Sequence, residues 1–345
     1  MRAQRMTGAS AAAAMGTSRL QRAQRRWCGW CGRHGPRLRP PPERQRGVAI
    51  VTALLLTTLA ITIVASLFWQ QQVQVRSIEN QRLQLQKQWV LRGALDWARL
   101  ILREDARYSL IDDLNEPWAV PLSETRLDRY VESASIRGNA GSAVLSGAIQ
   151  DAQARLNLAG LATRGEVNLA EVQAFERLLA ALRQDPGLAR ATAQQVAASQ
   201  RATQAEAGAP RPIGFAQVDD LLAVPGFTPA VLAAVRNDVV FLPRATPVNV
   251  NTAPAEVLAA RLATLSLADA TTLVNARRSA SFRDLNDFAA RLPGRPEPPP
   301  ASQAAVATSY FLVNGRVSIG EASLQVQGLV ERHGPTTHLV WLREV

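Results

Sequence analysis

The feature that most constrains this chain is the apolar run VAIVTALLLTTLAITIVASLF, which extends from Val48 to Phe68. Its twenty-one residues contain no charge, no glycine and no proline. As a helix rising about 1.5 Å per residue, the run spans about 30 Å, the thickness of a bilayer's hydrocarbon core. Arginines crowd the segment before it, whereas the segment after it, from Trp69, is rich in glutamine. The positive-inside rule therefore predicts one membrane helix with a cytoplasmic N-terminus and an exported body.

The charge of the chain is concentrated ahead of this run. The formal net charge is +11, but the first 47 residues hold eleven arginines and a single acid, Glu43. The chain beyond position 47 is close to neutral, so no broad field attracts nucleic acid or anionic lipid. Both cysteines, Cys28 and Cys31, also lie in this first segment. With only His34 nearby they fall short of the four ligands of a zinc site, and a disordered basic stretch is the favoured interpretation.

A helical pattern continues beyond the apolar run. No proline occurs between Val48 and Tyr108, which predicts one continuous helix of about sixty residues. In its second half Val90, Ala94, Trp97 and Ile101 recur at spacings of four, three and four. These spacings place them on one face, so we expect this face, Trp97 included, to pack in the core.

The rest of the chain has a strand-like pattern at both ends and a helical pattern between them. Residues 109–160 and 301–345 contain short alternating runs, such as Ala143 to Ile149, with turns expected at Asn314-Gly315, Gly320 and Gly334-Pro335. Neither half supplies many strands alone, so we expect one antiparallel sheet packed on the long helix. Residues 161–300 are alanine-rich and helical, with an internal break at 202–214. Helix N-termini are predicted there at Asn168 with Glu171, Ser266 with Asp269, Ser281 with Asp284, and Thr228-Pro229.

The predicted fold class is therefore α+β: a long, partly transmembrane N-terminal helix on an antiparallel sheet, with a large inserted all-α domain. The predicted organisation divides the chain into a leader and five further segments. They are 1–47, a leader; 48–68, the membrane helix; 69–108, the exported part of the helix; 109–160, the first sheet portion; 161–300, the inserted helical domain; and 301–345, the final strands.

The junction RQRG–VAIVTALLL resembles the class III signal of type IV prepilins and pseudopilins. The resemblance implies that prepilin peptidase cuts between Gly47 and Val48 on the cytoplasmic side. Forty-seven residues is long for such a leader, and Met6 and Met15 are alternative starts. Counted from Val48, the fifth position is Thr52, where most pilins carry glutamate. That glutamate neutralises the α-amine of a neighbouring subunit inside an apolar filament, where an unpaired charge is costly.

The missing glutamate and the phrases DAQARLNLAGL, VDDLLAVPGFTPAVLAAV and VNVNTAPAEVLAA resemble the general secretion pathway protein K family. The resemblance covers the chain from Arg46 to Val345 and implies a non-enzymatic minor pseudopilin of the type II secretion system. Its implied place is the tip of the pseudopilus, anchored by one span in the inner membrane with its body in the periplasm. The implied partners are minor pseudopilins I and J, with H as a further candidate, major pseudopilin G, prepilin peptidase and the inner-membrane assembly platform.

A membrane-anchored DNA-binding protein is the alternative hypothesis. LLAVPGFTPAVLAAV and the segment after it resemble helix-hairpin-helix units, whose Gly-x-Gly turns let backbone N–H groups approach a phosphate. The first unit keeps Gly226 but has Thr228 in place of the second glycine, and the second unit has Ser266 and Ala268. These side chains crowd the phosphate approach. Although Arg277, Arg278 and Arg283 form a small basic cluster, we expect protein contacts rather than nucleic-acid binding.

Neither His333 nor His338 lies near a nucleophile motif, so no enzyme activity is predicted. The segment IDDLNEPW groups four oxygen-bearing side chains, which are candidate calcium ligands: Asp112, Asp113, Asn115 and Glu116. The family resemblance implies a structural role for calcium, but this spacing matches no complete calcium loop and a solvated turn is the favoured interpretation. Asp151 and Asn157 are an alternative pair of ligands, and the sequence does not rank the two sets.

Overall fold

The computed structural model describes residues 46–345, apart from 128–142, 203–213, 293, 295–296 and 320–321. The chain divides into two units, one ending at Gln70 and the other beginning at Gln71. The helix α1, Arg46–Tyr108, contributes residues to both and is 63 residues long, which confirms the predicted continuous helix. In the described part of the first unit the large apolar side chains are exposed, from 52% at Ile63 to 72% at Trp69.

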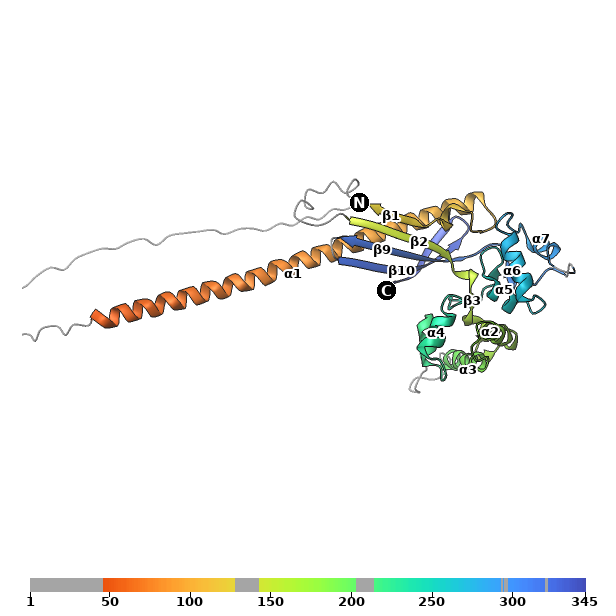
Figure 1. Ribbon diagram of the computed structural model, residues 1–345, viewed down its shortest axis with the longest axis horizontal. Helices are drawn as coiled ribbons and strands as arrows, with labels where there is room; N and C mark the ends of the chain where they lie inside the picture. Colours follow the sequence, from red (N-terminus) through yellow and green to blue (C-terminus); the bar gives the residue numbers. More distant parts are fainter. Residues whose placement is uncertain (1–45, 128–142, 203–213, 293, 295–296, 320–321) are drawn as a thin grey trace, which may run out of the picture. The chain divides into compact units, whose positions relative to one another are not determined.

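The second unit contains the sheet. Among the described residues it has five antiparallel strands in the order β1-β2-β9-β10-β11 (Figure 1). Strands distant in sequence are neighbours, since β2 pairs with β9 from Ala143↔Ile319 to Asp151↔Phe311. The predicted single sheet formed from both ends of the body is therefore confirmed. The strands are β1 (Leu122–Arg126), β2 (Ala143–Asp151), β9 (Tyr310–Ile319), β10 (Ala322–His333) and β11 (Thr336–Glu344).

The predicted turn at Asn314-Gly315 is wrong, because β9 continues through both residues. Gly315 instead lies opposite Gly147 of β2 in the sheet register. A Cβ atom added to Gly147 would stand 2.7 Å from the Asn314 carbonyl oxygen, and one added to Gly315 would stand 3.2 Å from Leu91 Cδ2. These glycines permit close approach of backbone and helix, which is the other common use of glycine in a strand.

The helix-rich insertion, residues 152–309, lies between the paired strands β2 and β9. Its helices bury one large apolar cluster that includes Phe175, Leu178, Val257 and Phe282. Three short strand pairs occur within it: β3 (Leu156–Asn157) with β6 (Val239–Val240), β4 (Ala162–Thr163) with β5 (Glu166–Val167), and β7 (Val248–Asn249) with β8 (Ala304–Ala305). Its helices are α2 (Leu169–Ala181), α3 (Gly187–Ala202), α4 (Pro229–Val235), α5 (Ala255–Arg261), α6 (Leu267–Ala276) and α7 (Leu285–Ala290).

Three of the four predicted helix starts are confirmed. Asn168, Thr228 and Ser266 each accept a backbone N–H bond at the start of a helix. At the fourth, the N-cap is Asp284 rather than Ser281. The Ser281 hydroxyl instead donates a hydrogen bond to the Asp113 carboxylate. Ser281 therefore makes a tertiary contact and does not cap the helix. Most of the predicted internal break at 202–214 lies outside the described residues.

Candidate functional site

The start of α1 carries the predicted processing site. Gly47 and Val48 are both exposed and helical, and a Cβ atom placed on Gly47 would meet no other atom within 4 Å. The Thr52 hydroxyl donates to the carbonyl oxygens of Val48 and Ala49, at 3.0 and 3.1 Å. The Thr52 hydroxyl thus bonds within its own helix, and this side chain carries no charge. By length and composition, α1 is apolar enough to cross a membrane in its first part, none of which is buried.

The prediction that Trp97 packs in the core is wrong, because 49% of its surface is exposed. Val90, Ala94 and Ile101 are only partly buried and flank the core. The buried face lies one residue further along, with similar spacing: Leu91, Leu95, Ala98 and Leu102.

The sheet explains this shift by one residue. Leu91 approaches Gly315, and a Cβ atom added to Gly328 would stand 3.5 Å from Leu95 Cδ1. Both leucines also pack on strand side chains, Leu91 beside Val317 and Leu95 beside Phe311 and Val330. A side chain at Gly315 would crowd Leu91, so this glycine was the feature of the sequence that could have indicated the correct face.

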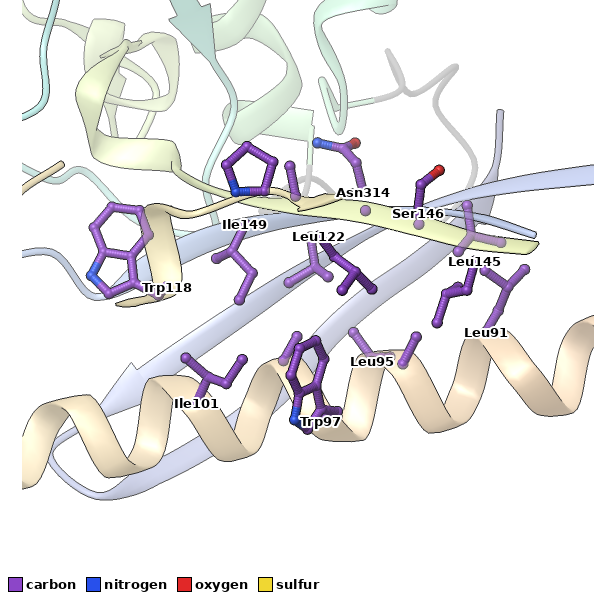
Figure 2. Close-up of a pocket in the computed structure, with 18 of the residues that line it drawn as sticks. Leu91, Leu95, Trp97, Ile101, Trp118, Leu122, Leu145, Ser146, Ile149 and Asn314 are labelled. Carbon is purple, nitrogen blue, oxygen red and sulfur yellow. The ribbon is translucent and has the colours of Figure 1, made fainter. Parts of the chain in front are cut away.

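Trp97 instead lines an apolar groove of about 320 Å³ between α1 and the strands β1 and β2 (Figure 2). Ile101 lines it from the helix, Leu122 from β1 and Ile149 from β2. Trp118 closes one end and packs edge-on against Phe311, with ring centroids 5.3 Å apart. The groove is open to solvent and presents almost no polar atoms, so it suits apolar side chains rather than a charged small molecule.

The four calcium candidates are not brought together as ligands. Asp112 is 1% exposed and accepts bonds from Arg332 and from the Thr308 backbone N–H. Asp113 accepts from the backbone N–H of Asn115, 2.7 Å away, and from the Ser281 hydroxyl. Glu116 accepts from the indole Nε1–H of Trp118 at 2.7 Å. Asp113 and Glu116 thus organise the turn that follows α1, whereas Asp112 joins this turn to Thr308 and Arg332.

Two of the four candidates, Asp112 and Glu116, do gather with Asp105, and one carboxylate oxygen from each of the three lies within 4.8 Å of the others. Two of these three residues already share a cation, since Arg332 pairs with both Asp105 and Asp112. Burial, and then the charge of Glu116, raises the pKa of Asp105 to about 6. Burial also raises the pKa of Asp112. A guanidinium already bridges Asp105 and Asp112, and calcium takes about six to eight oxygen ligands, so these three carboxylates do not form a calcium site by themselves.

Asp151 and Asn157, the alternative pair, serve separate contacts. Both are buried, at 4% and 5% exposed. Asp151 accepts from the Asn249 amide at 2.8 Å and the Thr252 hydroxyl at 2.6 Å. Asn157 donates to the Arg244 carbonyl at 2.7 Å and accepts from the Leu242 backbone N–H. They therefore hold the insertion in place instead of sharing a metal.

Sequence reasoning missed the buried polar network that results. The Asn249 amide also donates to the Asp112 carbonyl at 2.9 Å, so one chain of bonds runs from Asp151 through Asn249 to Asp112 and Arg332. Gln153 extends it by accepting from the Ser309 backbone N–H at 2.7 Å. We call Asp105, Asp112, Asp151, Asn249, Thr252 and Arg332 the polar joint. It links the end of α1, the insertion and strand β10.

Only one arginine of the basic cluster of the DNA-binding hypothesis is buried, and Arg278 and Arg283 remain exposed. Arg277 is 6% exposed and donates to the Val250 carbonyl at 2.7 Å, and burial lowers its pKa to about 10. Arg283 lies 3.7 Å from the carboxylate of Asp287. Gly226 has a φ of +97°, and a Cβ atom there would stand 2.7 Å from Leu188. The positive φ and the close packing on Leu188 both favour glycine at this position.

His333 and His338 both lie in the C-terminal part of the sheet, and His333 contacts an acidic side chain. His333 Nε2 lies 2.9 Å from Glu331, which also accepts from the Tyr310 hydroxyl at 2.7 Å. His338 lies in β11, opposite Glu331 in the register.

A long helix with an apolar start, packed on an antiparallel sheet, is the architecture expected of a pseudopilin subunit. Family models described as type II secretion system protein K match residues 154–244 and 248–308. The type II secretion system protein K of Pseudomonas aeruginosa is 30% identical over an alignment of 305 residues that covers 80% of this chain and 86% of that protein. The chain belongs to the type II secretion system protein K family. Its members are minor pseudopilins and not enzymes.

A solved structure shows the same fold. It is the GspK–GspI–GspJ complex of the type 2 secretion system from enterotoxigenic Escherichia coli. One of its chains resembles this one with a TM-score of 0.57 and 17% identity, over 78% of this chain and 99% of that chain. This likeness extends to the long helix, the antiparallel sheet and the α+β class.

Proposed function

We propose that this protein is the tip subunit of the type II secretion pseudopilus. In this role its helix packs with those of minor pseudopilins I and J, and H is a further candidate neighbour. The assembled tip then primes addition of major pseudopilin G beneath it at the inner-membrane assembly platform. The complex of GspK with GspI and GspJ in the E. coli system supports this choice of partners.

The observation that carries the proposal is Thr52. A repeating subunit needs a carboxylate at this depth to neutralise the amine of its neighbour, because an unpaired charge in an apolar filament is costly. Here the side chain is a neutral hydroxyl whose bonds go to its own helix. The first subunit has no neighbour ahead of it and needs no carboxylate. The insertion of residues 152–309 supports the same place, since so large an addition fits best where nothing stacks above it.

Processing and anchoring follow from the same role. Prepilin peptidase cuts between Gly47 and Val48 on the cytoplasmic face, and the apolar start of α1 remains as a single span in the inner membrane. The body then lies in the periplasm, the site of pseudopilus growth.

N-terminal sequencing of the mature protein is the direct test of processing. The expected first residue is Val48, and Gly47→Leu is expected to leave the precursor uncut. A mature start near Trp69 would instead identify an ordinary secreted protein. For the tip position, sheared pseudopili analysed by quantitative mass spectrometry should contain about one copy of this chain per filament, and a copy number close to that of pseudopilin G would refute it.

A further inference from the structure

The sheet covers α1 only from Lys87 onward and on one face, and the described side chains from Gln71 to Gln86 are all exposed. Along the uncovered side of α1, six residues recur at spacings of three, four, three, four and three, the interval that keeps side chains on one side of a helix. We call these residues the outer stripe: Val75, Ile78, Arg82, Leu85, Trp89 and Arg92. The sheet-facing residues Leu91 and Leu95 belong to a different face. The outer stripe thus has the seam spacing of a helix that pairs with another helix.

The apolar members of the outer stripe are strongly exposed. Val75 is 54% exposed, Ile78 51%, Leu85 56% and Trp89 68%. Beside them a groove of about 390 Å³ is lined by Leu85 and Trp89 on one side and by Leu324 and Leu342 of β10 and β11 on the other. Exposed apolar side chains next to a hollow of this size are typical of an interaction surface.

The charges of this segment indicate which kind of helix fits. Between Gln71 and Arg92 the exposed charged residues are three arginines, Arg76, Arg82 and Arg92, and one acid, Glu79. Lys87 is only 2% exposed and is not available to a partner. Arg82 and Arg92 occupy seam positions, and neither makes an ion pair with any residue that the structure describes. The Arg92 guanidinium lies over the Trp89 ring, 5.9 Å from its centroid. A partner that buried these arginines without carboxylates would leave unpaired charges, which is strongly unfavourable.

A second copy of this chain is a poor occupant for the same reason. Two copies aligned in parallel and in register bring Arg82 to Arg82 and Arg92 to Arg92, and like charges at a helix seam repel. The surface therefore selects a different helix whose facing side is apolar and acidic.

We propose that the outer stripe is the docking surface for the helix of a partner pseudopilin that places carboxylates opposite Arg82 and Arg92. This proposal rests on the proposed function, because it takes the partner to be minor pseudopilin I or J. It adds which face of α1 is used and which charge pattern the partner must carry.

The test compares two charge reversals on the same helix. Arg82→Glu lies on the outer stripe, whereas Arg76→Glu is a control that is also exposed, six residues away and on a different face. Each full-length variant is co-expressed with pseudopilins I and J, purified in detergent, and probed with antibodies to both. We expect Arg82→Glu to reduce the recovery of I or J at least tenfold, and Arg76→Glu to leave it within twofold. Equal recovery for the two variants would overturn the proposal.

Cross-linking locates the contact. The chain beyond position 47 has no cysteine, so Leu85→Cys provides a single attachment point for a benzophenone label in the processed protein. We expect it to capture pseudopilin I or J, whereas Leu110→Cys, 92% exposed and outside α1, should capture neither. A labelled homodimer would show a second copy on the stripe and overturn the proposal. If the wild-type chain binds neither I nor J, the proposed function itself fails, an outcome distinct from equal binding by Arg82→Glu.

Discussion

Arg332 and Asp112 form an ion pair beneath the surface, with side chains 8% and 1% exposed, across 220 residues of sequence. The same guanidinium pairs with Asp105 at 2.8 Å and lies 4.6 Å from the centroid of the Phe311 ring. One side chain of β10 therefore holds the last turns of α1 and the turn after them. Removing it would leave two carboxylates buried without a cation.

Arg332→Met is accordingly expected to destabilise the protein by about 3 to 5 kcal/mol, the usual cost of breaking one side of a buried pair. The measurement is urea unfolding of the full chain in detergent, monitored by tryptophan fluorescence. Arg316→Met is the control, since Arg316 is exposed and bonds only to Gln325 at 2.9 Å among the described contacts. Equal losses in the two variants would mean that the polar joint does not stabilise the fold.

Stability is expected to rise as the pH falls from 7.5 to 5. Burial raises the pKa of Asp105 to about 6 from an ordinary value of 3.8, so the folded chain holds a proton that the unfolded chain has lost. The stabilisation from this proton is complete below 3.8 and disappears as the pH rises through about 6. Burial, and then the charge of Glu256, also raises the pKa of Asp238 to about 6, so both groups contribute in this window.

Asp105→Asn tests this assignment. It should reduce the change in urea midpoint between pH 5 and 7.5 without abolishing it, because Asp238 still titrates. Asp96→Asn, an exposed change on the same helix, should retain the full dependence. An unchanged pH profile in Asp105→Asn would exclude Asp105 as a source.

The cross-strand glycine Gly147 and the helical glycine Gly93 give predictions of opposite sign. Gly147→Ala should destabilise the chain by about 1 to 3 kcal/mol, because its Cβ atom would meet the Asn314 carbonyl oxygen at 2.7 Å. Gly93→Ala should instead stabilise it by up to about 1 kcal/mol, since Gly93 is helical and a Cβ atom there meets nothing within 4 Å. The measurement is the thermal unfolding midpoint of both variants. If Gly147→Ala leaves this midpoint unchanged, the strands can separate there at no cost.

Thr52→Glu should leave secretion near normal or mildly reduced. As the first subunit, the protein has no amine ahead of it for the new carboxylate to neutralise. An unpaired carboxylate in lipid costs about 2 to 3 kcal/mol if it stays charged, and less if it takes up a proton. Secretion and the copy number per filament are the two measurements. A variant found repeatedly along the pseudopilus would show that position five, and not the insertion, determines the place of this subunit.

Duplex DNA should bind no better than non-specifically, with a Kd on the order of 10⁻⁴ M at physiological salt. The Arg277 guanidinium is buried on the Val250 carbonyl, so the basic cluster presents fewer free charges than its sequence indicates. Fluorescence anisotropy with a labelled duplex makes the measurement. Sub-micromolar affinity that falls steeply with salt would revive the DNA-binding hypothesis.

The sequence by itself determined the features that depend on neighbours along the chain. The uncharged run from Val48 to Phe68, the proline-free helix to Tyr108 and the alternating strands near the C-terminus all arise from short-range periodicity. The caps at Asn168, Thr228 and Ser266 are equally local, because each side chain bonds to a backbone N–H within three residues. Such patterns can be recognised without knowing what packs against them.

Only the tertiary structure decided which of two adjacent stripes of α1 is buried. Both stripes repeat at helical intervals of three and four residues. The sheet selects Leu91 and Leu95 because the side chains of Val317 and Phe311 pack against them and Gly315 leaves room for Leu91. Trp97 lines the groove instead. The same holds for Asp112, whose apparent grouping with Asp113, Asn115 and Glu116 gives way to a partner on β10. Sequence spacing alone does not show which face of a helix is buried, or which carboxylate of an acidic segment finds a distant partner. The shape of the opposing surface and the cost of burying an unpaired charge make the choice.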